Sequence, residues 1–63
     1  MQRSDLSFDR YYRVTGNTGD FHNFAEGDVL QLARFDGTNE PDFVRLSDGF
    51  TQFVSIVDLE VID

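Results

Sequence analysis

The chain has 63 residues, which is enough for one small domain but too few for two separate hydrophobic cores. Twelve acidic side chains oppose five arginines, and the resulting net charge of −7 argues against direct binding to the backbone of DNA or RNA while favouring a basic partner. The absence of cysteine excludes disulfide bonds and thiolate metal sites. Apolar runs are too short for a membrane span or a signal peptide, so we expect a cytoplasmic protein.

Residues 1–10 are mostly polar or charged. We expect them to form an N-terminal tail that is either disordered or pinned to the rest of the chain by Phe8. Residues 11–63 are expected to form the domain, because short apolar stretches there alternate with glycine, asparagine and aspartate turns at the spacing typical of an all-β fold. No stretch keeps a helical apolar period without a glycine or proline, so no α-helix is predicted.

Apolar residues at alternate positions predict strands, and turn residues mark their ends. In chain order, the predicted strands are residues 11–15, 28–35, 43–46, 50–55 and 60–62. A long loop separates the first two, an Asp-Gly-Thr-Asn-Glu-Pro turn follows the second, a Ser-Asp-Gly hairpin follows the third, and a short 3₁₀ turn is expected after the fourth. The third strand is expected to turn Phe43 and Arg45 outward. The predicted inward-facing residues are Tyr12, Val14, Leu30, Leu32, Val44, Leu46, Val54 and Leu59.

Two short segments carry a family resemblance. Glu-Gly-Asp-Val-Leu-Gln-Leu begins at Glu26 after the long loop, and Val-Ser-Ile-Val-Asp-Leu-Glu begins at Val54 near the end of the chain. With the hairpin between them, they resemble the SH3-like small barrels over about residues 11–62. The resemblance implies a five-stranded, mostly antiparallel SH3-like barrel. The small size and the segment Tyr-Arg-Val-Thr-Gly-Asn-Thr also look like small SH3-like proteins of tailed bacteriophages and prophages.

The departures from this family concern its ligand groove. Peptide-binding SH3 domains hold a polyproline helix between aromatic side chains, but this chain has no tryptophan. Phe43 stands where the family has its groove tryptophan, Ser55 where it has a proline and Asp58 where it has a tyrosine. Binding of a proline-rich peptide is therefore the third-ranked function.

Catalytic and metal-binding chemistry finds little support in the sequence. His22, the single histidine, lies near Asp20 in the long loop, but no nucleophile accompanies it. We expect His22 either to hold a turn or to contact a partner, and we expect neither an enzyme nor a cofactor. The acidic stretch from Asp36 to Asp42 departs from the spacing of a calcium loop, so no metal site is expected. Asp36 is instead expected to form a turn with Gly37.

Surplus aromatic side chains indicate a binding surface. Seven phenylalanines exceed what one small core can bury, and exposed aromatics beside charges are typical of protein interfaces. The leading hypothesis is a non-enzymatic protein–protein interaction module, whose partner is a host enzyme or regulator in the host cytoplasm if a phage encodes it. Both a monomer and a homodimer fit, because an edge strand offers a pairing surface. The expected contact residues are Phe21, His22, Phe43, Arg45 and Phe50.

An alternative hypothesis assigns the function to the negative charge. Carboxylates would imitate phosphates, and the domain would occupy the nucleic-acid groove of a polymerase, nuclease or restriction enzyme. The competing interpretation is that the charge serves only solubility. The candidate phosphate mimics are Asp20, Glu26, Asp28, Asp36, Glu40, Asp42 and Asp48.

Overall fold

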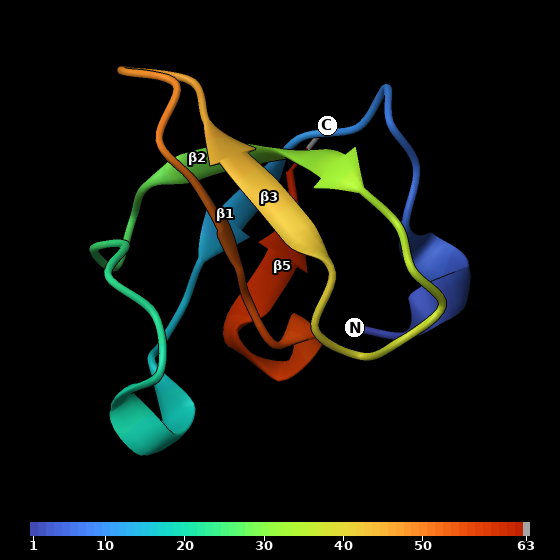
Figure 1. Cartoon of the computed structure of the whole chain (residues 1–63), viewed down its shortest axis with the longest axis horizontal. Helices are drawn as coiled ribbons and strands as arrows, with labels where there is room; N and C mark the ends of the chain where they lie inside the picture. Colours follow the sequence, from blue (N-terminus) through green and yellow to red (C-terminus); the bar gives the residue numbers. More distant parts are fainter. Residues whose placement is uncertain (63) are drawn as a thin grey trace.

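Five β-strands and three short 3₁₀ turns organise residues 1–62, the part of the chain that the computed structural model describes (Figure 1). The strands are β1 (Tyr12–Val14), β2 (Val29–Arg34), β3 (Asp42–Arg45), β4 (Thr51–Phe53) and β5 (Leu59–Val61). The 3₁₀ turns are η1 (Arg3–Asp5), η2 (Thr18–Asp20) and η3 (Ile56–Asp58). No α-helix occurs in residues 1–62, which confirms the all-β prediction. Within the same residues, no helix is long and apolar enough to span a membrane.

The strands form one antiparallel sheet in the order β4-β3-β2-β1-β5. β1 pairs with β2, β2 with β3 and β3 with β4, and the chain then passes through η3 so that β5 pairs with the free side of β1 (Figure 1). β4 and β5 are the edges of the sheet, and no ladder joins them within the described residues. The structure therefore shows an open five-stranded antiparallel sheet.

The core joins four strands to the loop between β1 and β2 (residues 15–28, called the β1–β2 loop). Its members are Tyr12, Val14, Phe24, Leu30, Leu32, Phe43, Val54 and Leu59. The inward orientation predicted for the apolar residues of β1 and β2, and for Val54 and Leu59, is confirmed. Phe24 belongs to the β1–β2 loop, so this loop packs onto the sheet through one buried aromatic ring.

β3 faces the opposite way from the prediction. Phe43 has no exposed surface, whereas Leu46 is 46% exposed and Val44 is only partly buried. The Phe43 ring packs edge-to-face against Tyr12, with centroids 5.5 Å apart, and Phe43 lies opposite Leu32 in the β2–β3 ladder. Both faces of β3 carry an apolar residue, so the alternation of apolar and polar side chains did not determine which face points inward. Burial of the larger aromatic ring decided the orientation.

Residues 1–10 fold against the sheet through contacts that the sequence did not predict. Met1 and Leu6 pack against the core. The Tyr12 hydroxyl donates a hydrogen bond to the backbone carbonyl that precedes Leu6 and accepts one from the backbone N–H that follows it, both at 2.9 Å. Phe8 is exposed, so its expected role as the pin is wrong. A phenol oxygen in β1 and two smaller apolar side chains hold the segment instead.

A matched pair of substitutions tests the facing of β3. Phe43→Ala removes a fully buried ring and should lower the free energy of unfolding by about 3–5 kcal/mol, a large share of the stability of so small a domain. Leu46→Ala removes a half-exposed side chain and should cost only about 0.5 kcal/mol. Urea denaturation measures both changes. A larger loss for Leu46→Ala than for Phe43→Ala would contradict the observed orientation.

Candidate functional site

Polar side chains hold the β1–β2 loop in place. The Asn17 side-chain amide donates to the carbonyl of His22 (2.8 Å), and its oxygen accepts from the backbone N–H of His22 (3.2 Å). Gln52 of β4 makes a similar pair: its Oε1 accepts from the N–H of Asn23 (2.8 Å), and its Nε2 donates to the carbonyl of Phe21 (3.4 Å). The loop is thereby fastened to an edge strand by side-chain bonds in place of a strand ladder.

Gly19 provides the turn on which the Phe21 ring lies. Its φ of +73° is in the left-handed region, where a side chain would strain the backbone. A Cβ atom at Gly19 would also overlap the Phe21 ring. The ring packs against this bare backbone and is 68% exposed, in agreement with the expectation that Phe21 lies on the surface.

His22 is 4% exposed and links two backbone segments of the loop. Its Nε2 lies 2.8 Å from the carbonyl oxygen of Gly16, and its Nδ1 accepts a hydrogen bond from the backbone N–H of Phe24 (3.2 Å). Because the Phe24 N–H is a donor, Nδ1 carries no proton and Nε2 donates to Gly16. The sequence left two roles open for His22, to hold a turn or to contact a partner. The structure shows that His22 holds the turn.

Asp58 of η3 fastens the first half of the loop. Its buried carboxylate accepts hydrogen bonds from the backbone N–H of Thr18 (3.0 Å) and from the Thr18 hydroxyl (2.7 Å). Ser55 precedes η3, and its hydroxyl oxygen accepts from the N–H of Val57 (3.4 Å). The sequence interpretation treated Asp58 and Ser55 only as losses from a proline groove. Asp58 and Thr18 are 40 residues apart, so no local pattern could reveal their bond.

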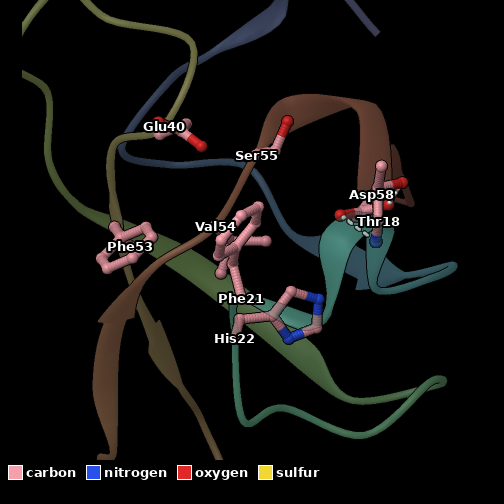
Figure 2. A pocket seen from close by; sticks show the side chains of 8 residues that line it. All are labelled: Thr18, Phe21, His22, Glu40, Phe53, Val54, Ser55 and Asp58. Atoms are coloured by element: carbon pink, nitrogen blue, oxygen red, sulfur yellow. Dashed lines mark hydrogen bonds between the residues drawn. The ribbon is translucent and has the colours of Figure 1, made fainter.

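These elements surround a pocket of about 120 Å³ between the β1–β2 loop and the segment from β4 to η3 (Figure 2). Phe21 and Phe53 both line it, and they remain 68% and 42% exposed, respectively. Glu40 lies on the same side as Phe53, opposite Asp58 (Figure 2). Among the described residues, no arginine lines the pocket. The complete lining is Thr18, Phe21, His22, Glu40, Phe53, Val54, Ser55 and Asp58.

Arg45 and Phe50, two of the predicted contact residues, belong to a separate cluster. The Arg45 guanidinium donates two hydrogen bonds to Asp48 (2.9 and 2.7 Å) and one to Asp28 (2.9 Å). It also lies over the rings of Phe24 and Phe50, at 5.6 and 5.4 Å from their centroids. These contacts join the β3–β4 hairpin to the end of the β1–β2 loop and to the core.

The candidate phosphate mimics differ in how far they are already engaged. Asp28 and Asp48 bind Arg45. Asp36 accepts hydrogen bonds from the N–H (3.0 Å) and hydroxyl (2.7 Å) of Thr38, as expected for a turn residue. Asp42 is half-buried, and Asp20 is exposed but accepts a hydrogen bond from the Asn17 amide (3.3 Å). Glu26 and Glu40 are exposed. No group of three or more histidine, aspartate or glutamate residues within 1–62 is placed to hold a metal ion.

The structure brings only part of the predicted contact set together. Phe21 and His22 line the pocket, whereas Arg45 and Phe50 lie in the other cluster. Phe43 is corrected from an exposed contact to a core residue, which has no surface to offer a partner. The prediction also missed Phe53 at the pocket. The alternation that places Val54 inward turns Phe53 outward, so a signal for it was present.

No protein-family model, curated protein or solved structure matches this chain. Its function must therefore be inferred from its own geometry. The pocket is the feature that combines a hollow shape, exposed aromatic rings and an exposed carboxylate.

The Arg45 cluster predicts how the domain responds to acid. Hydrogen bonds from Arg45 hold the pKa of the Asp48 carboxyl at about 2, and those from the Ala25 N–H and then Arg45 lower the pKa of Asp28. Both folded-state pKa values lie below the ordinary value of 3.8, so this stabilisation is present above about pH 4 and is lost as the pH falls toward 2. The urea midpoint of the wild type should fall over this range, and that of Asp48→Asn should fall less. Equal falls would contradict the role given to Asp48.

Proposed function

We propose that this chain is a non-enzymatic protein-binding module and that the pocket lined by Phe21 and Phe53 is its contact site. The observation that carries the proposal is the exposure of two large aromatic rings at one pocket. Removing such rings from water against a partner is a major source of binding free energy at protein interfaces. Exposed rings of this size have no comparable value for the stability of the isolated domain.

The pocket is preorganised. The Gly19 turn and the two hydrogen bonds of Gln52 position Phe21, and the Asp58 carboxylate positions Thr18. Groups that are already held lose little conformational freedom on binding, so more of the contact energy appears as affinity. This arrangement favours a specific contact over nonspecific adhesion.

The size and chemistry of the pocket favour a protein side chain over a small-molecule substrate. Its volume of about 120 Å³ is well below the roughly 300–1,000 Å³ of typical ligand pockets. His22 uses both ring nitrogens on the loop backbone, and Asp58 uses both carboxylate oxygens on Thr18. Both side chains are engaged in holding the loop, which supports a binding role for the pocket.

The charges indicate a basic partner. The Glu40 carboxylate makes no ion pair among residues 1–62, and the whole chain carries a net charge of −7. A partner that inserts one apolar side chain and surrounds it with lysine or arginine would complement this surface. We propose a host enzyme or regulator in the host cytoplasm as that partner, in keeping with the phage-like sequence features.

We also propose that the chain is related in fold to the SH3-like barrels, with a sheet that stays open between β4 and β5. The long β1–β2 loop, the tight β3–β4 hairpin and the 3₁₀ turn before the last strand support this, because the sequence resemblance rests on the same features. Recognition of proline-rich peptides receives less support. Ser55 and Asp58 replace two groove residues of that family, and both are engaged in local hydrogen bonds.

The alternative of a nucleic-acid mimic also has less support than the pocket. Arg45 already neutralises Asp28 and Asp48, so part of the proposed phosphate set is engaged within the chain. The salt dependence of binding separates the two proposals. A mimic should lose affinity steeply as salt rises, whereas binding through apolar contacts should change little.

Phe53→Ala tests the pocket, with Phe35→Ala as the matched control, since Phe35 is equally exposed but does not line the pocket. A bacterial lysate should contain a protein that the wild type and Phe35→Ala both capture and Phe53→Ala does not. With the purified partner, Phe53→Ala should reduce affinity at least about fivefold, or about 1 kcal/mol, while its melting temperature stays near the wild-type value. Unchanged affinity for Phe53→Ala would contradict the proposal, and a steep loss of wild-type binding with salt would favour the mimic.

A further inference from the structure

The β1–β2 loop closes around one protonation state of His22. Nδ1 must accept from the N–H of Phe24, and Nε2 must donate to the carbonyl of Gly16. The other neutral tautomer would place two donors together at Phe24 and two acceptors together at Gly16. Only the neutral ring with its proton on Nε2 satisfies both contacts.

A second proton on the ring is incompatible with this closure. The imidazolium carries N–H groups on both nitrogens, so Nδ1 can no longer accept from Phe24. The buried Phe24 amide would lose its partner and face another donor at a distance of 3.2 Å. An unpaired buried donor is costly, so the ring and the amide must separate.

The charges around the ring favour movement in one direction. Asp58 from η3 and Glu40 from the segment before β3 line the same pocket as the ring, and Asp20 lies in the loop itself (Figure 2). Arg45 of β3 lies 5.6 Å from the centroid of the Phe24 ring, and it is already paired with Asp28 and Asp48. A cationic ring is therefore attracted toward the pocket carboxylates.

This movement would change the pocket directly. His22 is one of its walls, and the adjacent Phe21 is another. The backbone of His22 is also clamped by Asn17, so displacement of the ring strains the segment that carries Phe21. An imidazolium that turns into a space of about 120 Å³ would occupy much of it.

We propose that His22 is a pH switch for the pocket. The neutral ring holds the β1–β2 loop closed and the pocket available, and protonation releases the ring from Phe24 and dismantles the pocket. The consequence, that a partner is held at neutral pH and released on acidification, rests on the proposed binding function. The rearrangement of the loop does not.

NMR of the full chain tests the loop without a partner. At pH 7.5, long-range ¹H–¹⁵N spectra should show the Nε2–H tautomer of His22, and the Phe21 ring should give an NOE to Gly19. The pH is then lowered until the ring shifts report the imidazolium. At that point the Phe24 amide should lose at least about tenfold in hydrogen-exchange protection, and the NOE should disappear. Persistence of both signals with a protonated ring would overturn the switch.

His22→Gln is the matched control, because glutamine offers one acceptor and one donor but does not titrate. This variant should keep the Phe21–Gly19 NOE at both pH values. If it loses the NOE at the same pH as the wild type, acid acts elsewhere in the domain and the switch is wrong. The wild-type titration is decisive by itself if the variant does not fold.

Binding then separates the switch from the proposed function. Affinity for the captured partner should fall at least about tenfold between pH 7.5 and the pH at which NMR shows the wild-type ring to be protonated, and it should be independent of pH for His22→Gln. If Phe53→Ala binds normally but the loop opens with pH, the pocket function fails and the loop switch stands. If Phe53→Ala abolishes binding but wild-type affinity is independent of pH, the function stands and the switch fails.

Discussion

The edge-to-face contact between the Tyr12 and Phe43 rings is the interaction on which the rest of the structure depends. A short chain without cysteine must be stabilised by its core alone, and these two side chains are the largest that are fully buried. The Tyr12 hydroxyl also holds residues 1–10 against the sheet. Phe43 sets the face of β3 and thereby places Arg45 where it reaches the acidic side chains of the hairpin and of the β1–β2 loop.

The pocket depends on a different kind of force. The β1–β2 loop contributes one buried phenylalanine to the core, and its shape otherwise follows from hydrogen bonds made by Asn17, His22, Gln52 and Asp58. A polar network is directional, so it positions Phe21 closely. It also depends on the protonation states of His22 and Asp58, its two titratable members, whereas an apolar core does not. For this reason the proposed binding pocket, and not the sheet, is the part of the molecule that we propose to respond to protonation of His22.

The strands were predictable because their signals are local. Alternating apolar residues and turn residues located all five strands to within a few residues, and they identified Val14, Leu30 and Leu32 as core. The orientation of β3 was not predictable, because Phe43 and Val44 are both apolar and lie on opposite faces of the strand. The sequence does not say which of the two side chains fits the space beside Tyr12. Phe21, which lines the pocket, was also predictable from the sequence, because a large aromatic side chain in a polar loop is a local signal.

By itself, the sequence determined an acidic all-β domain whose surplus aromatic side chains reach the surface. Tertiary structure alone decided which of them gather at one pocket: Phe21 from the loop and Phe53 from an edge strand meet there, while Phe50 packs beneath Arg45. It also decided that His22 and Asp58 hold the loop through hydrogen bonds. The physical reason is that alternation and turn chemistry are set by neighbours along the chain. The hydrogen bonds that shape the pocket join residues up to 40 positions apart, and they form only after the sheet has brought them together.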